Sequence, residues 1–341
     1  MKINLRLIFS FIFVLLISEN GSAASSPEIS ITGLVRQPLT LSMEDLNTFK
    51  SVRVRLNEVT TDKNFHGAFD YRGVPLRTLL ELADIQKKDA DFSKAIDLAI
   101  VIRNKDGKQT VVSWGEIFYK NPSEIIIAAS AEPIMPHKSC QSCHQPEVYQ
   151  PWLNQMKRQI GFPKLVVAND FYSDRSLENI VSIEVTDFHP VIETQIMKDL
   201  YSLSFAVTGL VKQKLSITDL SSYAHMEIEA KQMGDGKGYH GLKIFGGVSL
   251  LSVLKKAGID PDINTAFLIS APDGYRSLLS YGEVVLTSHG KDIIIADTVA
   301  GETLRKNGKF ILIMPDDLSA DRWVKAVSKI EVITFKPRPK E

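Results

Sequence analysis

Alternating apolar and polar residues predict strands in both halves of the chain. Residues 52–56 and 226–230 place apolar or small side chains at every second position, which is the period of a strand with one buried face. Residues 96–103 and 265–270 are largely apolar and lead into Asp-Gly turns, as buried strands commonly do. We therefore expect a fold rich in short strands.

Helical periodicity is confined to a few segments. Residues 73–83 and 247–257 carry Leu and Val at helical spacing and end near Asp84 and Gly258 respectively. Residues 41–49 and 217–223 are predicted as shorter helices. Many short strands with segregated helices are typical of an α+β fold rather than of regularly alternating α/β units.

The predicted elements recur because the sequence contains an internal duplication. The repetition predicts two similar domains, residues 28–189 and 205–336, joined by a partly helical linker at residues 190–204. The matching blocks occur in the same order in each half: 31–35 and 207–211, 65–67 and 239–241, 72–76 and 246–250, 106–107 and 273–274, 114–116 and 281–283, 125–128 and 293–296, 174–175 and 321–322, and 183–185 and 330–332.

The spacing of these blocks differs between the halves. Ile293 lies 168 positions after Ile125, whereas Ile330 lies 147 positions after Ile183, so the first half carries 21 extra residues between these points. We expect these residues to form an inserted loop at about residues 133–160. A loop added to an existing scaffold is a common way of installing a function.

The predicted insertion contains both cysteines of the chain, in the sequence Cys140-Gln141-Ser142-Cys143-His144. C-x-x-C-H is the attachment motif for c-type haem. The two thiols add across the porphyrin vinyl groups, and the adjacent imidazole binds the iron from the proximal side. We therefore predict one covalent haem c, attached through Cys140 and Cys143 and ligated by His144.

Two other uses of these cysteines stay open. In an oxidising compartment a C-x-x-C pair forms a disulfide or a redox-active dithiol, but neither explains His144. A zinc site from His137, Cys140, Cys143 and His144 has suitable ligand types. Its spacing is compressed compared with the usual two separated ligand pairs, so haem is the favoured interpretation.

The distal haem ligand has several candidates. Met156 comes first because the residues that follow the motif would return the chain across the haem, although ordinary core packing explains a methionine equally well. Met135 and His137 precede the motif closely, and His66 and His189 would need tertiary contacts.

Two polar pairs recur at equivalent points of the halves. His66 and His240 each precede a glycine, and we interpret them chiefly as loop histidines that pack against a turn. A contact to a pterin phosphate, or haem ligation by His66, is the alternative. Glu116 and Glu283 follow an aromatic residue and a glycine, where a carboxylate commonly stabilises a helix N-terminus. None of the four is expected to be catalytic.

The N-terminus predicts export. Lys2 and Arg6 precede an apolar run at residues 7–17, and small residues suited to signal peptidase follow at 21–24. The run is about half of the ~20 residues needed to span a bilayer. We therefore expect residues 1–24 to be a cleaved signal peptide, the mature protein to be periplasmic in a bacterium, and no stable membrane span to follow.

The repeated unit resembles the molybdopterin-binding domain of the sulfite-oxidase-like family. The residues that carry the likeness are 31–41, 71–80 and the Asp-Gly turns at 106–107 and 273–275. The resemblance implies two tandem α+β domains of that type. It also implies that a molybdenum-binding cysteine should stand where this chain has Leu56 and Ala230, and neither side chain can bind a metal. Molybdopterin is therefore not expected.

Taken together, the sequence predicts a monohaem c-type cytochrome that transfers electrons, on a scaffold that has lost its molybdenum site. Its partners would be periplasmic redox proteins. The balance of 40 basic and 40 acidic residues gives no indication of a nucleic-acid-binding surface. Two alternatives remain: a molybdopterin-dependent oxidoreductase with a haem relay, and a haem-based sensor of a gas or of redox state.

Overall fold

The computed structural model describes residues 27–88, 91–135, 137, 145–190, 194, 200–234, 238–305 and 308–336. Strands dominate these residues and the helices are short, so the fold is mixed α+β, as the periodicity predicted. No helix in the described ranges is long and apolar enough to cross a membrane. The predicted signal peptide and most of the predicted linker lie outside the described residues.

The first half contains a five-stranded sheet whose central strand is the last to appear in the sequence. The strand order is β2-β1-β9-β5-β6. Strand β9 pairs in parallel with β1 and antiparallel with β5, so the beginning and the end of this half lie side by side. The strands are β1 (Glu28–Gly33), β2 (Leu39–Ser42), β5 (Ala99–Asn104), β6 (Gln109–Ser113) and β9 (Ile180–Thr186).

A second sheet of the first half is wholly antiparallel and has the order β3-β4-β7-β8. It consists of β3 (Val52–Val59), β4 (Phe65–Pro75), β7 (Ile125–Pro133) and β8 (Lys164–Val167). Strands β3 and β4 form a long hairpin, and β3 includes the residues predicted to alternate as a strand. The loop between β7 and β8 holds the predicted insertion.

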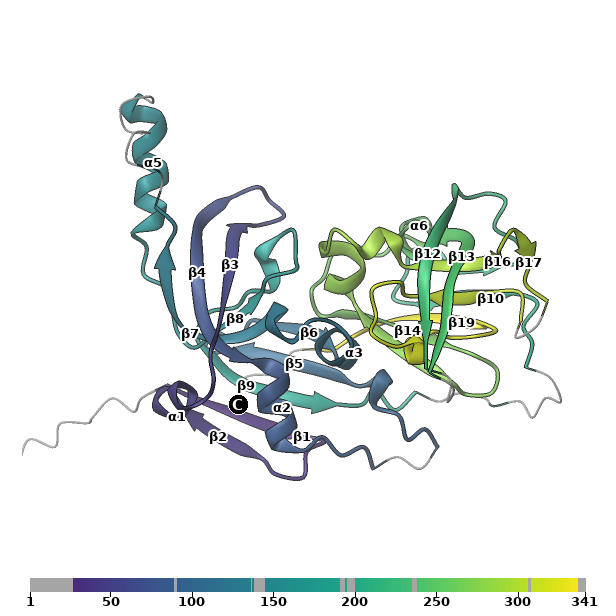
Figure 1. Ribbon diagram of the computed structural model, residues 1–341, viewed down its shortest axis with the longest axis horizontal. Coiled ribbons are helices and arrows are strands. Elements are labelled where there is room, and N and C mark those ends of the chain that lie inside the picture. The colour runs from purple at the N-terminus through teal and green to yellow at the C-terminus, as the bar shows by residue number, and fades with distance from the viewer. Residues whose placement is uncertain are drawn as a thin grey trace, which may run out of the picture.

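The second half shows the same two strand orders. Its sheets are β11-β10-β19-β14-β15, with β10 and β19 parallel, and β12-β13-β16-β17, with β18 also paired to β16. Figure 1 shows the two halves side by side. The strands are β10 (Phe205–Gly209), β11 (Leu215–Ile217), β12 (His225–Met233), β13 (Tyr239–Ser249), β14 (Thr265–Ser270), β15 (Arg276–Ser280), β16 (Ile294–Val299), β17 (Glu302–Thr303), β18 (Ile311–Ile313) and β19 (Lys329–Thr334).

Three of the four predicted helices form. Helix α1 (Met43–Thr48) begins with a capping box made by Ser42, and α2 (Leu76–Ala83) and α6 (Leu250–Ala257) end in left-handed residues. Helices α2 and α6 begin about one turn later than predicted because β4 and β13 continue up to them.

The predicted helix at residues 217–223 is wrong. Strand β11 ends at Ile217, and Asp219 then accepts hydrogen bonds from the backbone N–H of Ser221, at 3.1 Å, and from its hydroxyl. The segment is therefore a turn. Aspartate and serine satisfy backbone donors locally, and this competes with helix formation.

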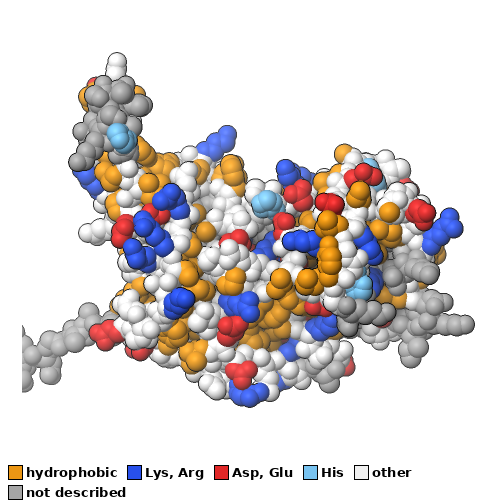
Figure 2. Space-filling view, in the orientation of Figure 1, with side chains coloured by type: hydrophobic (Ala, Val, Ile, Leu, Met, Phe, Trp, Pro, Cys, Tyr) orange, Lys and Arg blue, Asp and Glu red, His pale blue; other side chains and the backbone are white. Residues whose placement is uncertain are grey.

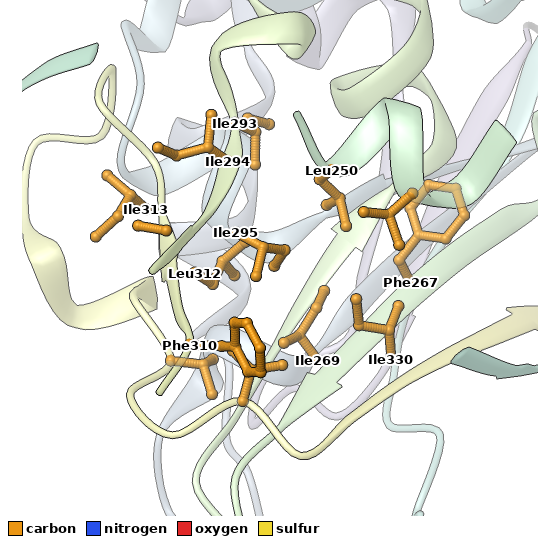
Figure 3. Close-up of a cluster of buried hydrophobic side chains, with 14 of the residues drawn as sticks. Leu250, Phe267, Ile269, Ile293, Ile294, Ile295, Phe310, Leu312, Ile313 and Ile330 are labelled. Carbon is orange, nitrogen blue, oxygen red and sulfur yellow. The ribbon is translucent and has the colours of Figure 1, made fainter. Parts of the chain in front are cut away.

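Each half packs its own apolar core between the sheets and the helix that follows the hairpin. In the second half, Leu250 of α6 packs in one cluster with Phe267 and Ile269 of β14 and with Phe310 (Figure 3). In the first half, α2 contributes the equivalent residues to a separate cluster. Separate cores let each half support a site of its own.

A smaller apolar cluster joins the halves. It combines residues of β5 and β6 with residues of β14, β15 and β19. The backbone N–H of Val111 also donates to the carbonyl of Ile263 at 3.0 Å. Equivalent strands of the two halves thus face each other, and the contact is approximately symmetric. The members of the cluster are Ala99, Val101, Val111, Ala266, Leu268, Leu278 and Ile333.

Candidate functional site

The predicted haem attachment residues Cys140, Cys143 and His144 lie outside the described residues. Helix α5 (Pro146–Met156) starts two residues after His144, with a proline at its first position, where the missing N–H costs no hydrogen bond. The helix stands away from the sheets beyond the end of β4 (Figure 1), and the same end of the molecule forms a projection in Figure 2.

Met156, the first candidate for the distal ligand, is the last residue of α5 and is only 3 % exposed. An α-helix rises 1.5 Å per residue, so about 15 Å separates Pro146 from Met156 along the axis. Tyr149 and Trp152 lie between them, with ring centroids 6.0 Å apart and ring planes inclined at 67°. Burial is compatible with either core packing or ligation, and Met156 stays a prediction as haem ligand.

An arginine just beyond α5 fastens this projection to the β3–β4 hairpin. The Arg158 guanidinium donates to the backbone carbonyl of His66 at 2.8 Å, to Glu178 at 2.6 Å, and to Glu58. Glu58 is buried on β3, and His66 lies on β4. The end of the predicted insertion therefore has a fixed position on the sheet.

Glu58 is the centre of this ionic cluster. Its carboxylate accepts hydrogen bonds from the Tyr71 hydroxyl at 2.5 Å and from Lys164 as well as from Arg158. Burial, together with the nearby Glu58 charge, raises the pKa of Tyr71 far above its ordinary value. Burial opposes ionisation of Glu178, but the Gly161 N–H and the two cations lower its pKa overall. Four charged groups thus fill this part of the first half.

The positions implied for a molybdenum-binding thiolate are apolar and buried in both halves. Leu56 is 4 % exposed and packs in a cluster with Phe69 and Tyr71, while Ala230 is 1 % exposed. Among the described residues, no group of three or more His, Cys, Asp or Glu side chains could hold a metal ion. The residues present do not fit a thiolate-anchored molybdopterin.

Neither His66 nor His240 belongs to a group of potential metal ligands among the described residues. His240 places Nε2 3.1 Å from the carbonyl of Gly234, across the turn of the β12–β13 hairpin. The interaction agrees with the expected role of packing against a turn. His66 uses its backbone carbonyl for Arg158, while its side chain is exposed.

The most buried polar residues lie elsewhere, at the contact between the halves. Arg175 pairs with Asp170 at 2.7 Å and with Glu116 at 3.0 Å, and it donates to Ser280 of the second half. Arg322 makes the matching set with Asp317, Glu283 and Ser113 of the first half. Each arginine thus holds two carboxylates of its own half and contacts a serine of the other.

Pairing with Arg175 and Arg322 gives the two glutamates a role beyond the expected stabilisation of helix N-termini. Glu116 does cap α3 (Trp114–Phe118), since it accepts the Ser113 N–H at 2.7 Å. It also neutralises Arg175, a pairing that the local sequence does not predict. One feature of the sequence could have indicated this pairing. The repeated Asp-Arg blocks supply an arginine, and the repeated aromatic-Gly-Glu blocks supply a glutamate, at equivalent positions of the two halves.

The two glutamates have opposite pKa shifts. Burial raises the pKa of Glu116 despite the opposing charge of Arg175. Burial acts in the same direction on Glu283, but Arg322 and Lys120 outweigh it and lower the pKa to about 2. The ammonium of Lys120 lies 3.7 Å from Glu283. Lys120 adds a second cation beside Glu283, whereas the negative charge of Glu283 lies near Glu116 and raises the pKa of Glu116 further.

Comparison with known proteins adds little to this picture. Neither protein-family models nor curated proteins match the sequence. Among solved structures, the sulfane dehydrogenase SoxCD from Paracoccus pantotrophus is similar over 91 % of this chain and 78 % of that chain, with 12 % identity and a TM-score of 0.33. At this TM-score the similarity assigns neither a family nor an activity to the chain.

Proposed function

We propose that the protein is an exported, periplasmic c-type cytochrome that carries one haem and transfers electrons. The observation that carries this proposal is the C-x-x-C-H sequence formed by the only two cysteines and His144. Cys140 and Cys143 would form the two thioether bonds, and His144 would bind the iron. The haem would supply the redox chemistry, and the protein would hold it and present it to a partner.

The arrangement around the motif supports this proposal. The segment between β7 and β8 spans residues 134–163, whereas the equivalent connection between β16 and β18 spans only residues 300–310. Matching strand orders in the halves support an internal duplication, and the longer connection supports an insertion in the first copy. Arg158 and its carboxylate partners hold the end of this connection against β3 and β4.

A molybdopterin-dependent oxidoreductase is the less favoured function. Its metal would need a thiolate where Leu56 and Ala230 are buried among apolar neighbours. A haem sensor would need an open sixth coordination position. We infer electron transfer because the sequence supplies nearby methionine and histidine candidates for that position.

The test is a pyridine haemochrome spectrum with metal analysis on full-length protein, produced in a host that matures c-type cytochromes. We expect about one covalent haem per chain and no molybdenum. Cys140→Ser with Cys143→Ser should abolish covalent haem, while Met135→Leu should leave it unchanged. Absence of haem from the unmodified protein would overturn the proposal, and stoichiometric molybdenum would favour the enzyme.

A further inference from the structure

The second half contains a cavity of about 490 Å³ that is lined in part by residues of the β12–β13 hairpin. Its floor is apolar and includes Phe245 of β13, Ile313 of β18 and Trp323. The rings of Phe245 and Trp323 meet edge to face, with centroids 5.4 Å apart. The indole N–H of Trp323 already donates to the Met314 carbonyl at 3.1 Å, so the floor offers hydrophobic surface rather than a hydrogen-bond donor.

Three cationic side chains line the same cavity: Lys243 of β13, Arg305 and Lys325. Glu302 is the only acidic residue among the lining residues. Lys243 and Arg305 are exposed, whereas the apolar floor is buried. The cavity therefore has an apolar interior and a predominantly positive mouth.

In the first half, charged side chains fill the position that corresponds to this cavity. By the sequence repeat, Glu58 corresponds to Gln232, Lys164 to Ile311, and Glu178 to Lys325. In the first half these three residues, with Arg158, form the buried ionic cluster described above.

The second half has an arginine of its own at this cavity, Arg305, but has neither carboxylate of that cluster. It has an isoleucine where the first half has the lysine that fills the interior. The substitutions remove negative charge and bulk together. Both changes favour the binding of an external anion over an internal ion pair.

We propose that this cavity binds an amphiphilic organic anion of the aromatic carboxylate class, without a metal. The aromatic body would pack on Phe245 and Trp323, and the carboxylate would lie at the mouth near Lys243 and Arg305. Sites of this kind commonly enclose 300–1,000 Å³ and combine apolar walls with a few charged groups that fix orientation. The site is formed by residues of the second half alone and does not depend on haem attachment.

The test is isothermal titration calorimetry of the full-length exported protein with 2-naphthoate and with its neutral isostere 2-naphthamide. We expect 2-naphthoate to bind at least tenfold more tightly than the amide. The preference should weaken as salt is added, because ions screen the exposed cations at the mouth. No binding, or equal affinity for the acid and the amide, would overturn the proposal.

Two sets of variants locate the site. Lys243→Gln with Arg305→Gln should weaken 2-naphthoate binding about tenfold and leave the amide unchanged. Lys231→Gln removes a cation from an exposed position of β12 that does not line the cavity, and it should have no effect. If the control weakens binding as much as the mouth variants do, the anion binds elsewhere and the proposal fails.

A third variant introduces into the second half the residues that correspond to Glu58 and Lys164 of the first half. Gln232→Glu with Ile311→Lys should fill the cavity and abolish binding of both probes. Undiminished binding by a folded form of this variant would contradict the assignment. If it does not fold, the mouth variants still decide the question.

Discussion

Arg322 of the second half lies directly against Gly115 of the first, so close that a Cβ on Gly115 would lie 2.3 Å from the arginine Cδ. The reciprocal contact joins Arg175 and Gly282, where a Cβ would lie 2.0 Å from the guanidinium. Each half therefore leaves out a side chain to admit a charged group of the other. The contact between the halves therefore depends on the missing side chains of these two glycines as well as on the charged groups.

Gly115→Ala should destabilise the protein, because the added methyl group must displace an arginine that holds two buried carboxylates. Overpacking of this kind costs about 1–3 kcal/mol. The measurement is the free energy of unfolding from urea titration. Asn47→Ala, at an exposed position of α1, is the control and should change that free energy by no more than about 0.5 kcal/mol. An equal, small effect of both substitutions would contradict the packing argument.

Glu283→Gln should cost more stability at neutral pH than in acid. The pKa of Glu283 falls from 4.5 to about 2 on folding, so its ionised form stabilises the protein above pH 4.5. That contribution declines as the pH falls toward 2. Breaking such a buried pair costs about 3–5 kcal/mol. Free energies of unfolding at pH 7 and pH 3 would show the variant's deficit shrinking in acid.

Glu116→Gln should show the opposite trend. The folded state raises the pKa of Glu116, so ionisation of this carboxyl opposes folding as the pH rises through 4.5. The loss of stability caused by Glu116→Gln should therefore be smaller at pH 7 than at pH 3. The loss caused by Glu283→Gln should be larger at pH 7 than at pH 3. Identical pH profiles for the two variants would contradict the opposite pKa shifts of the two glutamates.

Arg158→Met should release the end of α5 from the β3–β4 hairpin. The variant loses bonds to the His66 carbonyl, Glu58 and Glu178, and hydrogen bonds to charged groups contribute about 1.5–3 kcal/mol each. We expect faster amide hydrogen exchange in α5 and a loss of stability. Arg72→Met removes an exposed arginine whose nearest carboxylate oxygen is 3.9 Å away, and should change neither.

Met156→Leu distinguishes ligation from packing. The two side chains have similar volumes, so packing alone predicts a loss below about 1.5 kcal/mol and an unchanged haem spectrum. Ligation predicts a change in the visible spectrum and a lower reduction potential, because methionine raises the potential. Met233→Leu, at an exposed position of β12 in the second half, is the control. An unchanged spectrum would assign the sixth position to another residue.

Periodicity predicted the sheet-rich α+β fold and most strands, because burial on one face leaves an alternating pattern in strands such as β3. It failed at residues 217–223, where the local hydrogen bonds of Asp219 outweigh weak helical spacing. The partners of Glu116 and Glu283 could not be predicted from local sequence. Arg175 and Arg322 reach them only after distant strands assemble, and no spacing rule records that contact.

The central position of β9 has a consequence for the order of events during synthesis. Strand β9 is the last of its half to emerge, yet it separates β1 from β5, so neither side of the five-stranded sheet can be completed before residues 180–186 are present. Residues 140–144 emerge earlier. The two thiols and the imidazole therefore leave the ribosome while their own half is still open. If the proposed haem attachment takes place at this stage, a maturation enzyme would meet these residues as an unfolded peptide.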